Sequence, residues 1–285
     1  MHVPTAAQGA QDWPANRPHR PGSRLWLVAG TGEGPPLAEA LLARGWRLRL
    51  SVVTAAATRA YPPHPHLQVG VGALGAASGD SPHAAVEREL AQAEAMGDPF
   101  GWVVDASHPF ARRISAALAG ACAARRQPLL RLQRPLLPLG RALLLEDLED
   151  LPPHHRPGEH LLLALGARRL AEAIAASPGA RHHARVLPSV AGLQQALAAG
   201  LEPGRLACLR PGRGAAAIEA ALCRRWQIDT VLCRQSGGSS EAGWHRHCEA
   251  LHLRLLLLRR PPEPPGVEAL EGEALLARIG AAPLP

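Results

Sequence analysis

Residues 102–111, Trp-Val-Val-Asp-Ala-Ser-His-Pro-Phe-Ala, hold more reactive groups than any other short stretch of this chain. The apolar residues 102–104 predict a buried strand, which is followed by an acid, a hydroxyl and an imidazole at Asp105, Ser107 and His108. Pro109 favours the first turn of a helix that extends to about residue 125, because proline suits that position. Polar side chains at the carboxyl end of a parallel strand form ligand sites in open α/β sheets. The stretch is therefore predicted to line a ligand site.

Asp105, Ser107 and His108 are the residue types of a hydrolase triad, but their adjacency in sequence argues against that chemistry. A triad needs three side chains that converge in space, and neighbours on one turn usually diverge. A structural interpretation stays open, in which Asp105 accepts backbone N–H groups, Ser107 caps the helix and His108 supports the turn. The alternative is direct contact with a ligand.

A glycine-rich turn, Gly30-Thr-Gly-Glu-Gly34, follows the first apolar segment and precedes a helix expected to open at Pro35. Glycines let the backbone approach a phosphate, whose charge is favoured by the N–H groups at a helix start. The spacing is G-x-G-x-G, because prolines occupy the neighbourhood of the third glycine of G-x-G-x-x-G. No G-K-[ST] is present, which excludes a P-loop NTPase. An ordinary tight turn is the alternative to a nucleotide site.

The second predicted strand ends near Ser51, and Arg59 lies shortly beyond it. A hydroxyl or an arginine at this place suits the 2′-phosphate of NADP, whereas an acid would favour NAD. No acid occupies the stretch, so the sequence favours NADP.

The second half of the chain repeats this arrangement. The predicted strand 230–233 leads into Arg234-Gln-Ser-Gly-Gly238, so a strand again ends in a hydroxyl and two glycines before a helix. The earlier loop 210–214 adds two arginines at another strand end, where they would suit carboxylates. A turn without a ligand remains the alternative here also.

Short apolar runs alternate with helical stretches along most of the chain, which predicts βαβ units and parallel sheets. The fold class is α/β, with two Rossmann-like parallel-sheet domains and an interdomain cleft, since such clefts are common ligand sites. The expected organisation is a disordered extension at 1–23, an NADP-binding domain at 24–135, a proline-rich linker at 136–158, a substrate domain at 159–262 and a tail at 263–285.

The net charge of +7 is spread over both halves, and the chain contains one tyrosine and two phenylalanines. Without a groove-reading motif or stacking platforms, nucleic acid is not an expected partner, and a cleft for an anionic small molecule accounts for the charge equally well. No apolar run is long enough for a membrane span. The histidine pairs at 154–155 and 182–183 are expected in polar loops, and no metal-ligand spacing occurs. The five scattered cysteines favour free thiols in a reducing cytoplasm.

At four places the chain resembles the precorrin-6A reductases of cobalamin biosynthesis, the cobalt-precorrin-6A form included. The most specific is Asp105-Ala-Ser-His-Pro-Phe-Ala111, similar to the family's D-A-T-H-P-[FY]-A. The others are Gly30-Thr31 followed by an acid, the L-R-x-x-R-P element from Leu130 to Pro135, and Ser236-Gly-Gly238 with a later Arg259-Arg-Pro261. The chain departs from the family pattern in the loop 210–214, at Arg234, where lysine is common, and at Trp244.

The resemblance implies a reductase that uses NADPH, without flavin or metal, to reduce one double bond of a tetrapyrrole rich in carboxylates. A monomer or weak homo-oligomer is expected, with the metal content of the substrate open. The implied catalytic residues are Asp105 and His108. The implied cofactor-binding residues are Gly30, Thr31, Gly32, Glu33, Ser51, Arg59 and Ser107. The implied substrate-binding residues are Pro109, Phe110, Arg131, Arg134, Arg234, Ser236, Gly237 and Gly238. A non-catalytic nucleotide- or tetrapyrrole-binding module descended from such a reductase is the alternative.

Overall fold

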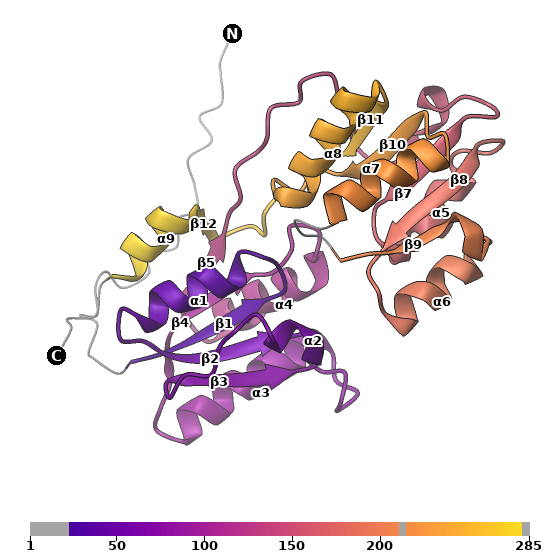
Figure 1. Ribbon diagram of the computed structural model, residues 1–285. Helices are drawn as coiled ribbons and strands as arrows, with labels where there is room; N and C mark the ends of the chain where they lie inside the picture. Colours follow the sequence, from indigo (N-terminus) through magenta and orange to yellow (C-terminus); the bar gives the residue numbers. More distant parts are fainter. Residues whose placement is uncertain (1–22, 211–214, 281–285) are drawn as a thin grey trace, which may run out of the picture. The chain divides into compact units, whose positions relative to one another are not determined.

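The computed structural model describes residues 23–210 and 215–280 (Figure 1). It divides into two compact units, of which unit 1 comprises the described residues up to Arg134 and from Pro261 onward, and unit 2 comprises Pro135–Arg260. Each unit has a parallel sheet with helices, so the predicted α/β class is confirmed. All of the expected extension at 1–23 except Ser23, and all of the loop 210–214 except Arg210, lie outside the described residues.

Unit 1 is a doubly wound sheet. Its elements are β1 (Arg24–Ala29), α1 (Gly34–Leu42), β2 (Arg47–Val52), α2 (Ala55–Thr58), β3 (Leu67–Val71), α3 (Pro82–Ala95), β4 (Phe100–Ala106), α4 (Arg112–Ala124), β5 (Leu129–Leu132), β12 (Glu268–Leu270) and α9 (Gly272–Ile279). In the described part of the chain the strand order is β12-β5-β4-β1-β2-β3. The order reverses between β1 and β4, and a doubly wound sheet binds its ligand at the carboxyl ends of the strands at such a switch point.

Unit 2 repeats the plan. Its elements are β6 (Leu143–Leu145), β7 (His160–Ala164), α5 (Leu170–Ala175), β8 (Arg181–Val186), α6 (Val190–Ala198), β9 (Leu206–Cys208), α7 (Ala215–Arg225), β10 (Thr230–Arg234), α8 (Ser239–Leu251) and β11 (Arg254–Leu258). The described strands are ordered β6-β11-β10-β7-β8-β9, which puts the switch point between β7 and β10.

The two units exchange edge strands, which corrects the expected linker and tail. Strand β6 lies in the stretch 136–158 that we expected to be a linker, yet it pairs with β11 of unit 2 through Leu256 and Leu143. Strand β12 lies in the expected tail and pairs with β5 of unit 1. Both strands are only three residues long. So short a strand carries no readable alternation of apolar and polar residues, which explains why the sequence pattern missed them.

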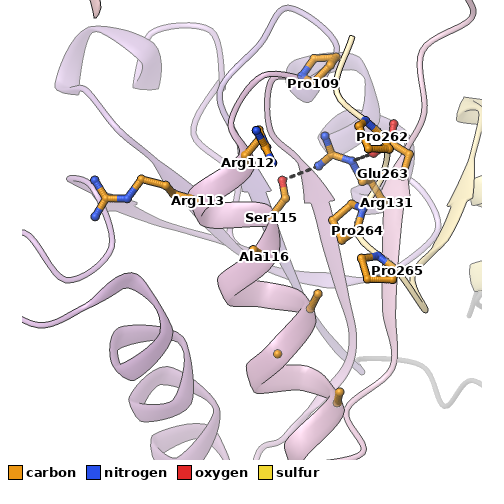
Figure 2. Close-up of a pocket in the computed structure, with 13 residues that line it drawn as sticks. Pro109, Arg112, Arg113, Ser115, Ala116, Arg131, Pro262, Glu263, Pro264 and Pro265 are labelled. Atoms are coloured by element: carbon orange, nitrogen blue, oxygen red, sulfur yellow. Dashed lines mark hydrogen bonds and ion pairs between the residues drawn. The ribbon is translucent and has the colours of Figure 1, made fainter.

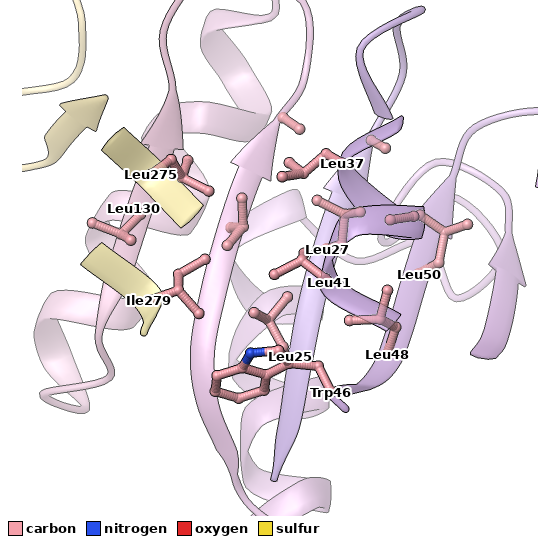
Figure 3. Packing of buried hydrophobic residues seen from close by; sticks show 14 of the residues in the cluster. Leu25, Leu27, Leu37, Leu41, Trp46, Leu48, Leu50, Leu130, Leu275 and Ile279 are labelled. Carbon is pink, nitrogen blue, oxygen red and sulfur yellow. The ribbon is translucent and has the colours of Figure 1, made fainter. Parts of the chain in front are cut away.

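The core of unit 1 lies on both faces of its sheet. In β1, Leu25 and Leu27 face a cluster closed by α1 and α9 (Figure 3), whereas Trp26 and Val28 face a second cluster formed with α3 and α4. A strand covered on both faces reads as a continuous apolar run instead of an alternating one, as β1 does. This packing fixes the carboxyl end of β1, where the glycine turn begins.

Two further expectations are corrected. His182 and His183 lie on β8 instead of in a polar loop, and His183 is buried. Helix α4 begins at Arg112 and not at Pro109, since residues 107–111 form a separate turn. The expectation of free thiols is confirmed for all five cysteines. None of the described helices has the length and hydropathy needed to cross a bilayer.

Candidate functional site

Two loops meet at the switch point of unit 1. The first, residues 30–33, follows β1, and the second, residues 107–111, follows β4. The Thr31 hydroxyl donates a hydrogen bond of 3.4 Å to the carbonyl oxygen of Ala106, which ties the first loop to the end of β4, directly before the second loop. The structure thus brings together the two sequence motifs that were expected to bind a ligand.

The glycines of the first loop differ in what they allow. A Cβ added to Gly30 or Gly32 would meet no atom of the described residues within 4 Å, so the protein's own packing does not require glycine there. A Cβ on Gly34 would lie 2.2 Å from the Tyr61 hydroxyl and 2.9 Å from the Ala29 side chain. Gly34 therefore serves the close helix–strand packing of the third glycine in a dinucleotide fingerprint, one position earlier than in G-x-G-x-x-G.

Helix α1 offers an anion fewer donors than the sequence led us to expect. Pro35 and Pro36 occupy its first turn and have no N–H group. The N–H of Gly34 is bonded to the Thr31 carbonyl at 3.2 Å. Any phosphate at this place must therefore be held by the loop that precedes the helix.

Glu33 and Arg134 bind each other. The Arg134 guanidinium lies 2.7 Å from the Glu33 carboxylate, and the glutamate makes no side-chain cap on α1. The family resemblance implies a cofactor contact for Glu33 and a substrate contact for Arg134. Their ion pair neutralises both charges at the rim of the glycine turn and ties the end of β5 to the start of α1.

Asp105 and Arg131 form the centre of a buried polar network, and each is only 2% exposed. One Asp105 oxygen accepts the Ser107 N–H at 2.9 Å, and the other is bonded to Arg131. Arg131 also donates to the Ser115 hydroxyl at 2.8 Å and to Glu263. Buried charges need partners of this kind, so the network anchors the loop after β4. Asp105 was predicted to be catalytic and Arg131 to bind substrate. In the structure these two side chains bind each other.

The His108 ring is oriented by its own turn. Its Nδ1 accepts the Phe110 N–H at 3.1 Å, and the Ala111 N–H donates to the His108 carbonyl at 2.7 Å. Because Nδ1 is an acceptor, the hydrogen of the neutral imidazole sits on Nε2. The ring and the half-buried Phe110 ring have centroids 5.8 Å apart. This arrangement fixes the orientation of the His108 ring.

The remaining predicted cofactor residues have varied environments. The Ser51 hydroxyl is buried and accepts the indole N–H of Trp26 at 2.9 Å, which commits it to the core. The buried Ser107 hydroxyl lies 3.3 Å from that of Ser115 and does not cap α4, whose N-cap is Ala111. Arg59 is exposed and ends α2, just after the carboxyl end of β2.

A cavity of about 820 Å³ lies beside this network in unit 1 (Figure 2). One wall is α4, the other is the proline-rich segment 262–265, and Pro109, Arg131 and Glu263 also line it. Neither Ser115 nor Glu263 was predicted from the sequence motifs as a member of the site. Glu263 is 132 residues away from Arg131, so no local pattern connects them.

In unit 2, the loop after β10 is held by a glutamate that the sequence reasoning missed. The Gly237 N–H donates to the buried Glu241 carboxylate at 2.6 Å, and Gly237 has a φ of +69° that favours glycine. Ser236 is buried, and Gly238 is the N-cap of α8. Arg234 ends β10 and lies against Gly166, the residue that opens the loop after β7. The predicted residues of this loop thus lie at the switch point of unit 2.

Fold and site together define a doubly wound α/β protein whose switch-point glycine turn has room for a ligand. The chain belongs to the precorrin-6x reductase family CbiJ/CobK, whose model matches residues 24–279. The family expected from the sequence motifs is thereby confirmed.

The relatives extend over most of the chain. Cobalt-precorrin-6A reductase of Synechocystis sp. is 34% identical over 249 residues, which cover 85% of this chain and 90% of that one. Precorrin-6A reductase of Rhodococcus erythropolis is 31% identical over 268 residues, which cover 88% and 95%. The solved structure of CobK precorrin-6A reductase has a TM-score of 0.69 at 23% identity and covers 92% of this chain and 100% of that chain, a likeness of fold.

Proposed function

We propose that this protein uses NADPH to reduce one double bond of a precorrin-6A-type macrocycle. The observation that carries the proposal is the open glycine turn at the switch point of unit 1. Gly30 and Gly32 have neither a positive φ nor a close neighbour among the described residues that would require glycine. Space that a Cβ would fill is what a cofactor phosphate needs in order to approach the backbone. The family membership of the chain gives the turn its reductase context.

The residues around the turn fit this cofactor. Loop backbone N–H groups at Thr31 and Gly32 would hold the pyrophosphate, since the helix prolines have none. Arg59, exposed beyond β2, would pair with the 2′-phosphate. When bound, NADPH supplies a hydride, and the protein's part is to orient the partners and exclude competing reactions.

His108 would supply a hydrogen bond or a proton at the reacting end. Its Nε2–H belongs to a ring fixed by the Phe110 N–H, at the carboxyl end of β4 next to the glycine turn. Addition of a hydride to one carbon of a double bond requires a proton at the neighbouring carbon, and a positioned imidazole is suited to that task. Pro109 and Phe110, in the same turn, would contact the macrocycle.

A surplus of seven positive charges suits a substrate rich in carboxylates. We place the protein in the cytoplasm on the strength of its free thiols, as a monomer or weak homo-oligomer.

The decisive assay mixes the purified protein with NADPH and either metal-free or cobalt-loaded precorrin-6A and follows NADPH absorbance. Substrate-dependent loss of NADPH supports the proposal, whereas tight binding of both ligands without turnover would identify a binding module instead.

Substitution of Gly32 by valine is expected to weaken NADPH binding by more than about tenfold, or about 1.4 kcal/mol. A Cβ at this position would meet no described atom within 4 Å, so the fold should keep its stability while the phosphate space is filled. Titration of NADPH by fluorescence and urea unfolding measure the two effects. Gly204→Val is the matched control, because its Cβ also meets nothing and it lies in unit 2. Equal NADPH affinity in the two variants would contradict the assignment of the turn.

Replacement of His108 by alanine is expected to lower kcat by more than about tenfold, a usual scale for loss of a positioned acid or donor. His108→Asn separates two roles, because its amide oxygen can still accept the Phe110 N–H but no group replaces Nε2–H. A low kcat in both variants assigns the effect to Nε2. If His108→Asn has the wild-type kcat and kcat/KM, the histidine serves only the turn.

A further inference from the structure

The Ser-Gly-Gly turn of unit 2, residues 236–238, is held by side chains on both sides. Before the turn, the side-chain oxygen of Gln235 accepts the backbone N–H of Arg260 at 3.2 Å, which ties the turn to the segment after β11. Within the turn, the Gly237 N–H donates to the Glu241 carboxylate at 2.6 Å. These two bonds fix the turn where β10 ends, at the switch point of unit 2.

Glu241 bonds the turn instead of the helix to which it belongs. It is the third residue of α8, the position from which a glutamate in a capping box bonds the N–H of the N-cap residue. The N-cap here is Gly238, and the carboxylate reaches one residue further, to Gly237. Gly237 has a φ of +69°, a left-handed conformation that favours glycine. The bond therefore supports an unusual backbone conformation outside the helix.

The burial of Glu241 shows how unusual this arrangement is. Asp105, Glu159 and Glu219 are also buried, and each lies within ion-pair distance of an arginine. Glu241 is only 1% exposed, and its ion-pair contact in the described part of the chain is His245, whose Nε2 lies 3.7 Å from Oε1. That distance is too long for a hydrogen bond. A buried carboxylate is costly without partners, and the hydrogen bond that Glu241 makes goes to the backbone of the turn.

We propose that Glu241 is a positioning residue for the substrate, because its bond to the Gly237 N–H keeps the Ser-Gly-Gly turn in the conformation that contacts the macrocycle. Turns at the carboxyl ends of parallel strands form the ligand sites of doubly wound sheets. The contact between this turn and the macrocycle belongs to the proposed function, on which this inference rests. Glu241 itself is buried, so it acts through Gly237 and does not touch a ligand.

The role can be tested by binding in the absence of NADPH, when no reduction takes place. Precorrin-6A is titrated into the full-length protein, and its Kd is measured from the quenching of tryptophan fluorescence. Glu241→Met fills a similar space but accepts no bond from Gly237, and we expect Kd to rise about tenfold. Glu241→Gln keeps an oxygen for the Gly237 N–H, and its Kd should stay within about threefold of wild type. Glu241→Asp, one methylene shorter, replaces the methionine variant if that protein does not fold.

Glu159→Met is the matched control. Glu159 is likewise a buried glutamate of unit 2 that accepts a backbone N–H, from Arg156 at 2.9 Å. It directly precedes β7, at the amino end of the strands and away from the switch point. Its replacement should lower the free energy of unfolding in urea without changing the Kd of the macrocycle. Equal Kd values in Glu241→Met and Glu159→Met would overturn the proposal.

Steady-state kinetics separate this role from the proposed reaction. In an active enzyme, Glu241→Met is expected to raise KM for the macrocycle about tenfold and to leave kcat close to wild type, the pattern of a lost binding contact. An unchanged KM would overturn the proposal. A wild-type protein that binds the macrocycle but does not reduce it contradicts the proposed function alone, because the Kd comparison still reports on Glu241. A wild-type protein that does not bind the macrocycle would overturn both.

Discussion

Replacement of Arg131 by methionine is expected to lower the free energy of unfolding by about 3–5 kcal/mol, the usual cost of removing one partner from a buried ion pair. The change leaves Asp105 and Glu263 without their shared cation, and Asp105 is buried away from water. It also removes the donor to the Ser115 hydroxyl. Urea unfolding of the full-length protein, followed by circular dichroism, measures the loss.

Two further variants show whether the network is the cause. Arg125→Met makes the same substitution at an arginine that pairs with Glu94 at the surface, where such ion pairs contribute about 0–1 kcal/mol. Combining Arg131→Met with Asp105→Asn removes the uncompensated charge and should recover part of the lost stability. A loss in Arg131→Met no larger than that in Arg125→Met would mean that the network does not stabilise unit 1.

The buried pair illustrates what the sequence could have told us about the site. Asp105 follows two buried valines, and Arg131 stands between two leucines of a predicted strand. A charge embedded in an apolar strand must find a partner, and these two residues lie opposite each other on β4 and β5. The adjacency of the strands, which the βαβ rhythm implies, was the missing step.

For the fold, the sequence pattern predicts the central strands but not the edge strands β6 and β12. The strands that lie in the middle of each sheet are apolar runs between helices, and this alternation predicts them from the sequence. The exchange of β6 and β12 could not be predicted. Each follows the strands of one unit in sequence but pairs in the other, so its partner is set by tertiary packing and not by local composition. The glycine turn could be predicted only in part. Its position follows from the sequence, but the role of Gly34 depends on its contact with Tyr61, 27 positions along the chain.

Acidification from pH 7 to pH 4 is expected to lower the free energy of unfolding by about 3 kcal/mol through His183 alone. Burial, then the charges of His160 and Arg205, lower the pKa of this histidine from 6.5 to about 4. Its ring lies against the His160 and Trp226 rings, whose centroids are 5.4 Å and 4.9 Å away. Neither ring nitrogen has a hydrogen-bond partner among the described residues. A proton on this ring is therefore disfavoured in the folded protein.

The direction of the effect follows from which state binds the proton. Above about pH 6.5 His183 is neutral in both states and contributes no pH dependence. Between pH 6.5 and pH 4 the unfolded chain binds a proton at this histidine that the folded chain does not bind. The free energy of unfolding therefore decreases as the pH is lowered. His183→Phe keeps an aromatic ring in the stack and removes the titration, so its stability should fall less over this range in urea unfolding at several pH values. His66→Phe, at an exposed loop position of unit 1, should keep the wild-type profile. If His183→Phe and wild type lose stability in parallel from pH 6.5 to pH 4, another group is responsible for the acid sensitivity of unit 2.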